Sequence, residues 1–154
     1  MKPKFQRLYN NIAHEVAKMS HARRLQVGAV IVKDDRVISM GYNGMPAGWE
    51  NNCEYEVTEI QPEYGVGSIL VTTGELKTRP EVLHAESNAI AKLAKSNDSG
   101  LGADLFITHA PCMECSKLIF QSGISRVYYS QDYRDDSGIK FLKQSGVEVI
   151  KHEQ

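Results

Sequence analysis

The sequence is poor in cysteine, in long apolar runs and in net charge. It has 3 cysteines, an odd number with two of them three positions apart, and this does not make a disulfide framework. No apolar run approaches the ~20 residues that a membrane-spanning helix requires, and the N-terminal segment has no apolar signal core. The 18 Lys and Arg balance 19 Asp and Glu, which leaves no excess positive charge for a polynucleotide. We therefore expect a cytoplasmic protein that binds neither a membrane nor a polynucleotide.

The length of 154 residues fits one domain of ordinary size, so we expect a single domain over residues 1–154. Its charges are unevenly placed along the chain. Residues 1–36 carry eight Lys or Arg against three acids, a balance of +5, whereas residues 37–76 carry six Glu and no base, a balance of −6. The basic N-terminal third is able to serve one or a few phosphates, but charge alone favours an ordinary solvated surface.

The first half of the chain combines a helix, a hairpin and an irregular stretch. Apolar residues at steps of three and four predict an amphipathic helix in the N-terminal segment. Two β-rich runs follow, residues 27–33 and 36–42, and the aspartate pair between them predicts a hairpin. Residues 43–83 contain many Gly, Pro and Asn, and we expect a long irregular loop there, with a short strand near 69–72. Such a loop is usually functional or reaches toward a partner.

Strand and helix patterns alternate in the second half of the chain. We expect helices over residues 87–96, 111–121 and 137–144, and strands over residues 103–109, 126–130 and 147–151. This alternation predicts right-handed crossovers and parallel strand pairing. The expected fold is therefore α/β, with an antiparallel hairpin that leads into a parallel βαβαβ run.

Two short motifs carry the chemistry, the triplet HAE at residues 84–86 and the pentapeptide PCMEC at residues 111–115. Cys112 and Cys115 share one face of the first turn of an expected helix. Unpaired backbone N–H groups and the positive end of the helix dipole favour thiolates at this position. His84 lies where another helix is expected to begin. One imidazole and two thiolates make three zinc ligands, and three leave a coordination position for water, whereas a structural zinc normally has four protein ligands.

Glu86 is the candidate proton carrier beside this zinc. It follows His84 by two residues, about 200° round an ideal helix, so we do not expect it to be a fourth ligand on the same face. Because the zinc lowers the pKa of its water, a flanking carboxylate is able to take the released proton and pass it to a substrate. The combination of HxE with PCxxC is the signature of zinc deaminases that act on cytosine or adenine rings.

Each motif alone admits another explanation. An HxE triplet is common by chance, and a CxxC pair also occurs in structural zinc sites and in thioredoxin-type redox sites. Here both motifs fall at expected helix N-termini, 28 residues apart and across one strand. The joint pattern therefore favours a catalytic Zn²⁺ site.

The motifs and their surroundings resemble the zinc-dependent cytidine/deoxycytidylate deaminase superfamily, and within it the deoxycytidylate (dCMP) deaminases. The resemblance extends over nearly the whole chain. It rests on VGAVIVKDDRVISMGYNGMPAG, LHAESNAI, PCMECSKLIFQSGISRVYY and DYRDDSGIKFLKQSGVEVI. It implies a three-layer α/β/α sandwich around a five-stranded mixed sheet.

The resemblance also implies the reaction and several residue roles. The reaction is hydrolysis of dCMP to dUMP and ammonia, with zinc on His84, Cys112 and Cys115 and with Glu86 as the proton shuttle. Further implied contacts are Asn43 with the sugar, the Ala85 backbone with the pyrimidine edge, and Tyr133 stacked on the ring. Asn43 is equally explained as a turn residue bonded to local backbone, and Tyr133 nearly as well as a packing residue.

The substrate phosphate needs donors, and the basic N-terminal third supplies most candidates. They are Ser20, His21, Arg23 and Arg24, with Arg134 as a further one. Arginine suits a bidentate phosphate contact, although an exposed pair of arginines is usually just solvated.

The resemblance further implies a homohexamer that dCTP activates and dTTP inhibits. On that likeness the regulatory nucleotide site includes Gly44, Met45, Gly48 and Glu50, although a plain tight turn accounts for the glycines equally well. Some relatives bind a second, structural zinc, but Cys53 and His21 are the only obvious leftover ligands here, so we do not expect one.

Two alternatives remain beside dCMP deamination. The first is a tRNA adenosine deaminase, which uses the same zinc chemistry but needs a basic strand-binding surface, and the balance of charges speaks against it. The second is a non-catalytic, zinc-stabilised nucleotide-binding protein of the same fold, which has no use for the Glu86 carboxylate.

Overall fold

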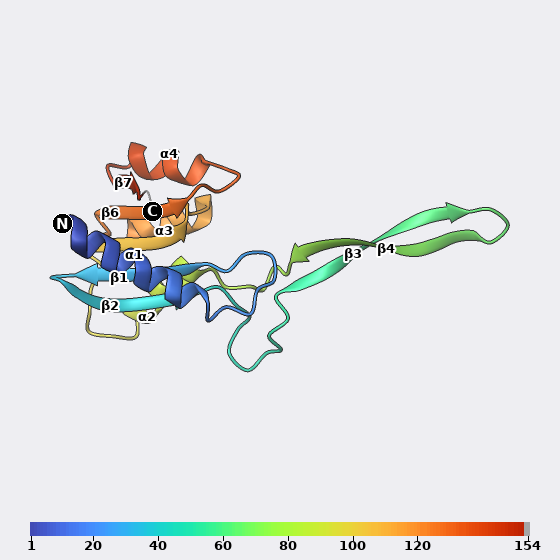
Figure 1. The fold of residues 1–154 in the computed structure, drawn as a ribbon, viewed down its shortest axis with the longest axis horizontal. Coiled ribbons are helices and arrows are strands. Elements are labelled where there is room, and N and C mark those ends of the chain that lie inside the picture. The colour runs from blue at the N-terminus through green and yellow to red at the C-terminus, as the bar shows by residue number, and fades with distance from the viewer. Residues whose placement is uncertain (153–154) are drawn as a thin grey trace.

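A five-stranded mixed sheet forms the centre of the computed structural model, which describes residues 1–152 (Figure 1). The strand order is β2-β1-β5-β6-β7. The strands are β1 (Gly28–Lys33), β2 (Arg36–Tyr42), β5 (Asp104–His109), β6 (Arg126–Gln131) and β7 (Glu148–Lys151). Strand β1 pairs antiparallel with β2 and β5, whereas β5, β6 and β7 run parallel. The predicted hairpin and parallel run are both confirmed. Residues 153–154 of the expected domain lie outside the described part.

Four helices cover the two faces of this sheet. They are α1 (Pro3–Ala17), α2 (Ala85–Leu93), α3 (Met113–Gln121) and α4 (Ser137–Gln144). Alternate residues of β1 supply two cores, as the two-residue period of a strand requires. Ala29 and Ile31 pack in the core that α2, α3 and α4 share, and Val30 and Val32 pack with α1. The result is the expected α/β/α sandwich.

The β1–β2 turn bears out the expectation drawn from two consecutive aspartates. Asp34 and Asp35 both have positive φ, 50° and 56°, as a two-residue type I′ hairpin turn requires. Strand β2 is an edge strand, and side chains of α2 donate hydrogen bonds to its backbone carbonyls. Lys92 Nζ donates to the Met40 carbonyl at 2.7 Å and Asn88 Nδ2 donates to the Tyr42 carbonyl at 2.8 Å.

The prediction of an irregular loop over residues 43–83 is wrong for its central part. Strands β3 (Glu54–Glu63) and β4 (Gly67–Thr78) form a long antiparallel hairpin, which we call the arm. The arm projects away from the sandwich (Figure 1). Nearly all of its residues are exposed on both faces, so the alternation of apolar and polar residues that marks a half-buried strand is missing from the sequence.

Within residues 1–152, none of the helices has the length and apolar content needed to cross a bilayer.

Candidate active site

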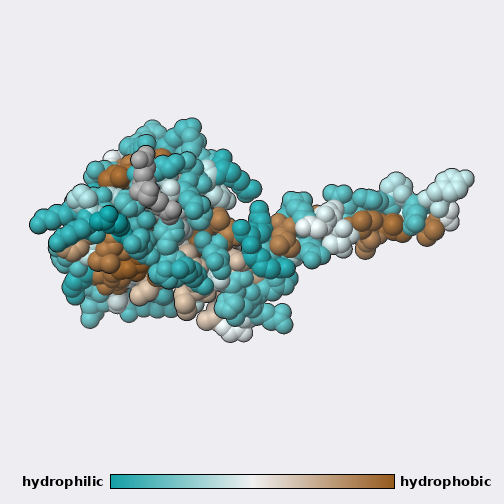
Figure 2. Space-filling model, viewed as in Figure 1, coloured by the Kyte–Doolittle hydropathy of each residue, from teal (hydrophilic) through white to brown (hydrophobic). Residues whose placement is uncertain are grey.

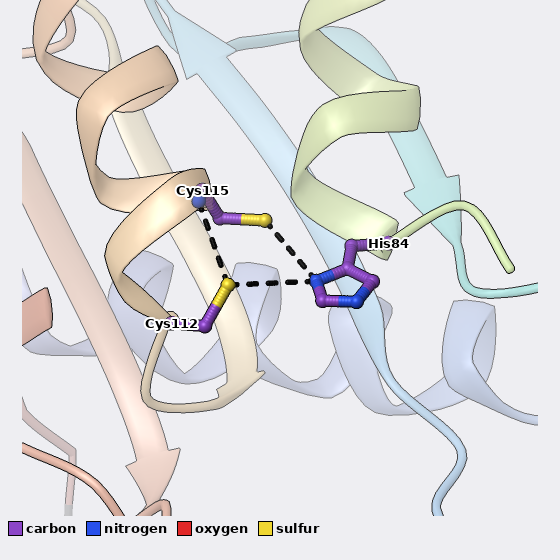
Figure 3. A group of neighbouring side chains, drawn as sticks. All are labelled: His84, Cys112 and Cys115. Atoms are coloured by element: carbon purple, nitrogen blue, oxygen red, sulfur yellow. Dashed lines mark hydrogen bonds between the residues drawn. The ribbon is translucent and has the colours of Figure 1, made fainter. Parts of the chain in front are cut away.

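Three side chains converge where α2 and α3 begin (Figure 3). His84 is the N-cap residue of α2, Cys112 is the N-cap residue of α3, and Cys115 lies in the first turn of α3. His84 Nδ1 is 3.6 Å from the Cys112 sulfur and 3.4 Å from the Cys115 sulfur. In a tetrahedral zinc site, with ligands at about 2.3 Å for sulfur and about 2.0–2.1 Å for nitrogen, these atoms are about 3.5 Å apart. The three donors are therefore spaced as zinc ligands.

The packing of α3 against α4 fixes the position of Cys112. A Cβ atom on Gly138, near the start of α4, would lie 2.2 Å from the Pro111 carbonyl oxygen and 2.9 Å from the Cys112 carbonyl carbon. Only glycine allows this close approach. The Cys115 backbone N–H donates to the Cys112 sulfur at 3.5 Å and caps α3.

The two thiols have different pKa values. Hydrogen bonds from the Cys115 thiol and from His84 lower the pKa of Cys112 to about 4. The pKa of Cys115 is raised, because its proton is held in the hydrogen bond to Cys112 and because the side chain is buried. The hydrogen bond to Cys112 also raises the pKa of His84. Metal binding requires both sulfurs as thiolates and a neutral imidazole, so it displaces the protons that these side chains hold in its absence.

Glu86, in the first turn of α2, is 4% exposed. Burial raises the pKa of its carboxyl to about 7, while its backbone N–H and the nearby His84 act in the opposite direction. A carboxyl whose pKa lies near neutrality is able to accept and return a proton. Glu86 lines the same cavity as two of the metal donors, His84 and Cys112.

This cavity has a volume of about 410 Å³, which is in the range of small-molecule sites. Of the implied substrate contacts, Asn43, Ala85 and Tyr133 line it. The Asn43 side chain is anchored on the segment before β1, since its Oδ1 accepts the Val27 N–H at 2.9 Å and its Nδ2 donates to the Leu25 carbonyl at 2.8 Å. These partners are 16 and 18 residues away along the chain, so Asn43 is not a turn residue bonded to its local backbone.

The phosphate candidates separate into two groups. Arg24 and Arg134 line the cavity. The described residues that line it do not include Ser20, His21 or Arg23. The buried Ser20 hydroxyl donates to the Asn43 carbonyl at 2.8 Å and accepts a backbone N–H, so it is already bonded.

The side chain of Arg23 is engaged by two polar neighbours, Asn52 and Glu54. Its Nη2 donates to Asn52 Oδ1 at 3.3 Å, and its Nε is 3.5 Å from Glu54 Oε2. The structure therefore does not bring Ser20 or Arg23 to the cavity as side-chain ligands.

Among the residues of the cavity wall that sequence reasoning missed are Glu54 and Thr78. They are the first residue of β3 and the last of β4, and they pair across the base of the arm. Both lie in the stretch expected to be irregular, where no motif marked them.

The implied regulatory residues lie beside a second hollow, of about 310 Å³. Met45 and Glu50 line it together with Trp49 and Arg79. Gly44 instead pairs through its backbone with Leu83 at distances of 2.8 and 3.1 Å. Gly48 has a φ of 86°, so the turn accounts for this glycine. A Cβ atom on Gly44 would meet no atom in residues 1–152 beyond its own chain neighbours within 4 Å, so packing does not require glycine there.

Cys53, the third cysteine, is buried beside Ala22 and Val82 and contacts Met45. Among residues 1–152, the metal-donor group that forms is His84 with Cys112 and Cys115.

Comparisons with known proteins agree with this geometry. The sequence profile described as "Cytidine and deoxycytidylate deaminase zinc-binding region" matches residues 3–131. The chain is 38% identical over 138 residues to ComE operon protein 2 of Bacillus subtilis (strain 168), covering 89% of this chain but only 65% of that protein. It is 35% identical over 164 residues to the deoxycytidylate deaminase of Enterobacteria phage T4, covering 90% of this chain and 85% of that one.

A solved structure resembles the whole chain. The crystal structure of dCMP deaminase from the cyanophage S-TIM5, in complex with dCMP and dUMP, superposes with a TM-score of 0.85 at 41% identity. The match covers 99% of both chains. The arm and the cavity wall therefore fall within the part of the chain that has a structural counterpart.

Proposed function

The chain belongs to the zinc-binding family of cytidine and deoxycytidylate deaminases, and from this membership we propose that it hydrolyses dCMP to dUMP and ammonia. The observation that carries the proposal is the placement of a buried carboxylate, Glu86, in one cavity with the metal donors His84 and Cys112. A near full-length match to an enzyme whose crystal holds dCMP and dUMP supports this choice of substrate.

The metal would be held by His84, Cys112 and Cys115, which fit Zn²⁺ in donor type and spacing. When bound, zinc supplies a water that ionises near neutral pH. The three side chains leave one side of the site open toward the cavity, where a pyrimidine ring is able to enter.

Glu86 moves the protons in this proposal. Its carboxylate accepts the proton of the attacking water and gives it to N3 of the pyrimidine ring. The carboxylate then takes the proton of the hydroxyl group added at C4 and delivers it to the leaving amine as the C4–N bond breaks and the carbonyl forms. Burial keeps bulk water from competing for these transfers, so the same oxygen atoms serve each step. Charge on the ring is then neutralised as it develops.

The cavity wall supplies substrate contacts. We assign the sugar to Asn43, the pyrimidine edge to the backbone of Ala85 and the ring face to Tyr133. Of the phosphate candidates we select Arg24 and Arg134, because both line the cavity. The Arg134 guanidinium lies 5.7 Å from the Tyr133 ring centre, so one residue pair is able to serve ring and phosphate together.

We also propose regulation and assembly on the pattern of the family. In this proposal dCTP activates and dTTP inhibits at the second hollow, with Met45 and Glu50 on its wall and Gly44 and Gly48 shaping the chain beside it. The protein is proposed to be a homo-oligomer, with a hexamer as the expected form.

The test of the activity is an ultraviolet deamination assay on deoxycytidine, dCMP and dCTP, with zinc measured in the same preparation. We expect about one zinc per chain and a kcat/KM for dCMP at least about a hundredfold above that for deoxycytidine, because charged hydrogen bonds to the phosphate contribute to binding. Equal rates on dCMP and deoxycytidine, or preferential deamination of a tRNA anticodon stem, would contradict the proposal.

A further inference from the structure

The arm is the most exposed part of the protein. Its two strands pair with each other over nearly their full lengths, and no other helix or strand within residues 1–152 packs extensively on them. At 10 and 12 residues the strands extend roughly 35–40 Å. An isolated two-stranded hairpin is at best marginally stable in water, so an arm of this length needs something to pack against.

One face of the arm carries an apolar pair. Ile60 and Leu70 lie directly opposite each other across the two strands and are 72% and 74% exposed. Near the tip, Tyr64 and Val66 are exposed as well. Apolar surface lies along the arm in Figure 2. Clustered apolar side chains on a projecting segment are typical of an interaction surface.

Charge identifies the surface that fits the arm. Without the buried Glu54, residues 55–78 carry four Glu and one Lys, a balance of −3, whereas residues 1–36 carry a balance of +5. The arm points away from its own sandwich, so its outer half does not reach the basic residues of its own chain (Figure 1). On a second copy, Lys2 at the N-cap of α1 and Arg7 within α1 are exposed and can be reached, and opposite charges favour that encounter.

We propose that the arm is an interaction surface for a second copy of this chain, with its exposed glutamates set against basic residues in the N-terminal third of that copy and its Ile60–Leu70 pair buried in the contact. Two copies exchange arms reciprocally, and such exchange gives closed symmetry. The inference rests on the proposed homo-oligomer for the identity of the partner and is independent of the deaminase activity.

The test measures the mass of the assembly in solution by sedimentation. In the double variant Ile60→Ser with Leu70→Ser, we expect self-association to weaken at least about tenfold, since truncating a buried apolar contact commonly costs that much. Thr58→Ser with Thr72→Ser is the matched control, because this pair neighbours the apolar pair across the same two strands. The control is expected to keep the wild-type mass. Zinc content and deamination are followed in both variants to verify that the sandwich is folded.

The outcomes separate the two proposals. An unchanged mass for the Ile60→Ser, Leu70→Ser variant in an oligomeric wild type would overturn the role of the arm and leave the homo-oligomer standing. A monomeric wild type would overturn both, whatever its activity on dCMP.

A second inference comes from a different observation, a buried carboxylate at the base of the arm. Glu54 is 1% exposed, and its Oε1 accepts the backbone N–H groups of Arg23 at 2.8 Å and Arg24 at 3.1 Å. Its Oε2 makes no hydrogen bond and lies 3.5 Å from Arg23 Nε. A carboxylate is costly to bury unless it is hydrogen-bonded. Solvent is excluded here, so the Glu54 carboxylate, and not water, satisfies the backbone N–H groups of Arg23 and Arg24.

These contacts fix the segment that carries a phosphate candidate. Arg24 Nη1 donates to Thr78 Oγ1 at 3.0 Å, and both residues line the active-site cavity. Glu54 holds the backbone of Arg24, and Thr78, its cross-strand partner, holds the guanidinium. We infer that Glu54 is a positioning residue that sets Arg24 for the substrate phosphate, an inference that rests on the proposed dCMP deamination.

The test compares a phosphorylated with an unphosphorylated substrate. In Glu54→Gln the ratio of kcat/KM for dCMP to that for deoxycytidine is expected to fall at least about tenfold, mainly through KM, because charge-assisted hydrogen bonds are lost. Thr78→Val is expected to change the ratio in the same direction without altering a buried charge. Glu56→Gln, exposed two residues further along β3, is the control and is expected to keep the wild-type ratio.

An equal loss on both substrates, in Glu54→Gln and in Thr78→Val alike, would reduce Glu54 to a structural residue and overturn the inference. A wild type that does not deaminate dCMP would instead overturn the proposed function.

Discussion

The metal centre has three donor side chains, the smallest set that holds zinc in a catalytic site. Each donor lies at the N-terminus of a helix, which fixes its position, so the loss of one donor is not compensated by movement of another. The remaining cysteine, Cys53, lies in the small buried cluster beside Ala22 and Val82 and is not a reserve ligand. Removal of a single donor therefore has a sharp outcome.

Replacing Cys115 by serine is expected to reduce bound zinc from about one per chain to nearly none after dialysis, because only two of the three donors then remain. Atomic absorption on the dialysed protein measures this directly. Cys53→Ala, the removal of a cysteine outside the site, is expected to retain its zinc. If Cys115→Ser kept a full complement of metal, the assignment of the ligands would be wrong.

Replacing Glu86 by glutamine separates metal binding from proton transfer. The variant is expected to keep about one zinc per chain and to lose at least about a hundredfold in kcat on dCMP, since general acid–base groups contribute about 10²–10⁴-fold. Zinc analysis and the deamination assay on one preparation check both parts. Loss of zinc in this variant would make Glu86 a structural residue of the centre.

The zinc motif was predictable from residue types and spacing, whereas the phosphate contacts were not. An imidazole and two sulfurs at helix starts have few other uses, and the structure brings these three together. Arg23 and Arg24 are adjacent and chemically identical in the sequence. Only the path of the chain turns Arg24 into the cavity and Arg23 toward Asn52.

At the scale of the elements, the start of α4 supports the start of α3. Gly138 lies against the Pro111 and Cys112 backbone at a distance that leaves no room for a side chain. A methyl group there must push α4 away from the residue that carries one of the two sulfurs. The metal centre therefore depends on the packing of a helix that contributes no ligand.

Gly138→Ala is accordingly expected to destabilise the protein by about 1–3 kcal/mol, the usual cost of overpacking, and so to lower Tm by about 2–12 °C. Zinc should also dissociate faster, because Cys112 is displaced. Thermal unfolding and chelator-driven metal release measure the two effects. Lys143→Ala, on an exposed position of the same helix, serves as the comparison, and a Tm equal to that variant's would refute the packing argument.

The helices and sheet strands were predicted because each buries at least one face in a core. The expected helix over residues 137–144 coincides with α4, and the expected helix over 87–96 is displaced by two to three residues from α2. Of the arm, only the short strand near residues 69–72 was expected, and it lies within β4. The rest was missed because the arm has no buried face, and because Pro62 and Gly74 lie inside its strands. Where pairing alone organises a segment, hydrophobic periodicity carries no signal.

At the scale of the whole molecule, zinc joins two helices that are separated along the chain by β5. Binding at their N-termini therefore stabilises the folded sandwich as a unit, because the unfolded chain does not hold its donors together. The same consideration makes thermal stability a measure of metal occupancy.

Removal of zinc by a chelator is expected to lower Tm by about 5–11 °C when the metal was present at about a hundred times its Kd, a loss of about 2.7 kcal/mol. Differential scanning calorimetry before and after dialysis against chelator gives the shift, and re-addition of Zn²⁺ should restore it. Mg²⁺ added instead should have no effect, since it disfavours sulfur ligands. An unchanged Tm after complete removal would mean that the site does not support the fold.

The proposed regulation belongs to the scale of the whole molecule, and one residue is able to report on it. The single tryptophan, Trp49, lines the second hollow, so its fluorescence is expected to change when dCTP or dTTP binds there. At sub-saturating dCMP the two nucleotides should shift the rate in opposite directions. Unchanged fluorescence and rate with both nucleotides would leave the Gly44–Glu50 stretch with a structural role alone.

The hydrogen bonds that Lys92 and Asn88 donate to carbonyls of β2 have a consequence for aggregation. A bare outer strand is a template on which foreign β-segments align, the first step toward fibrous deposits. Here an incoming segment would have to displace a charged amine and an amide before it could align along β2. Addition of further strands at the β2 edge is thereby disfavoured, even at high protein concentration.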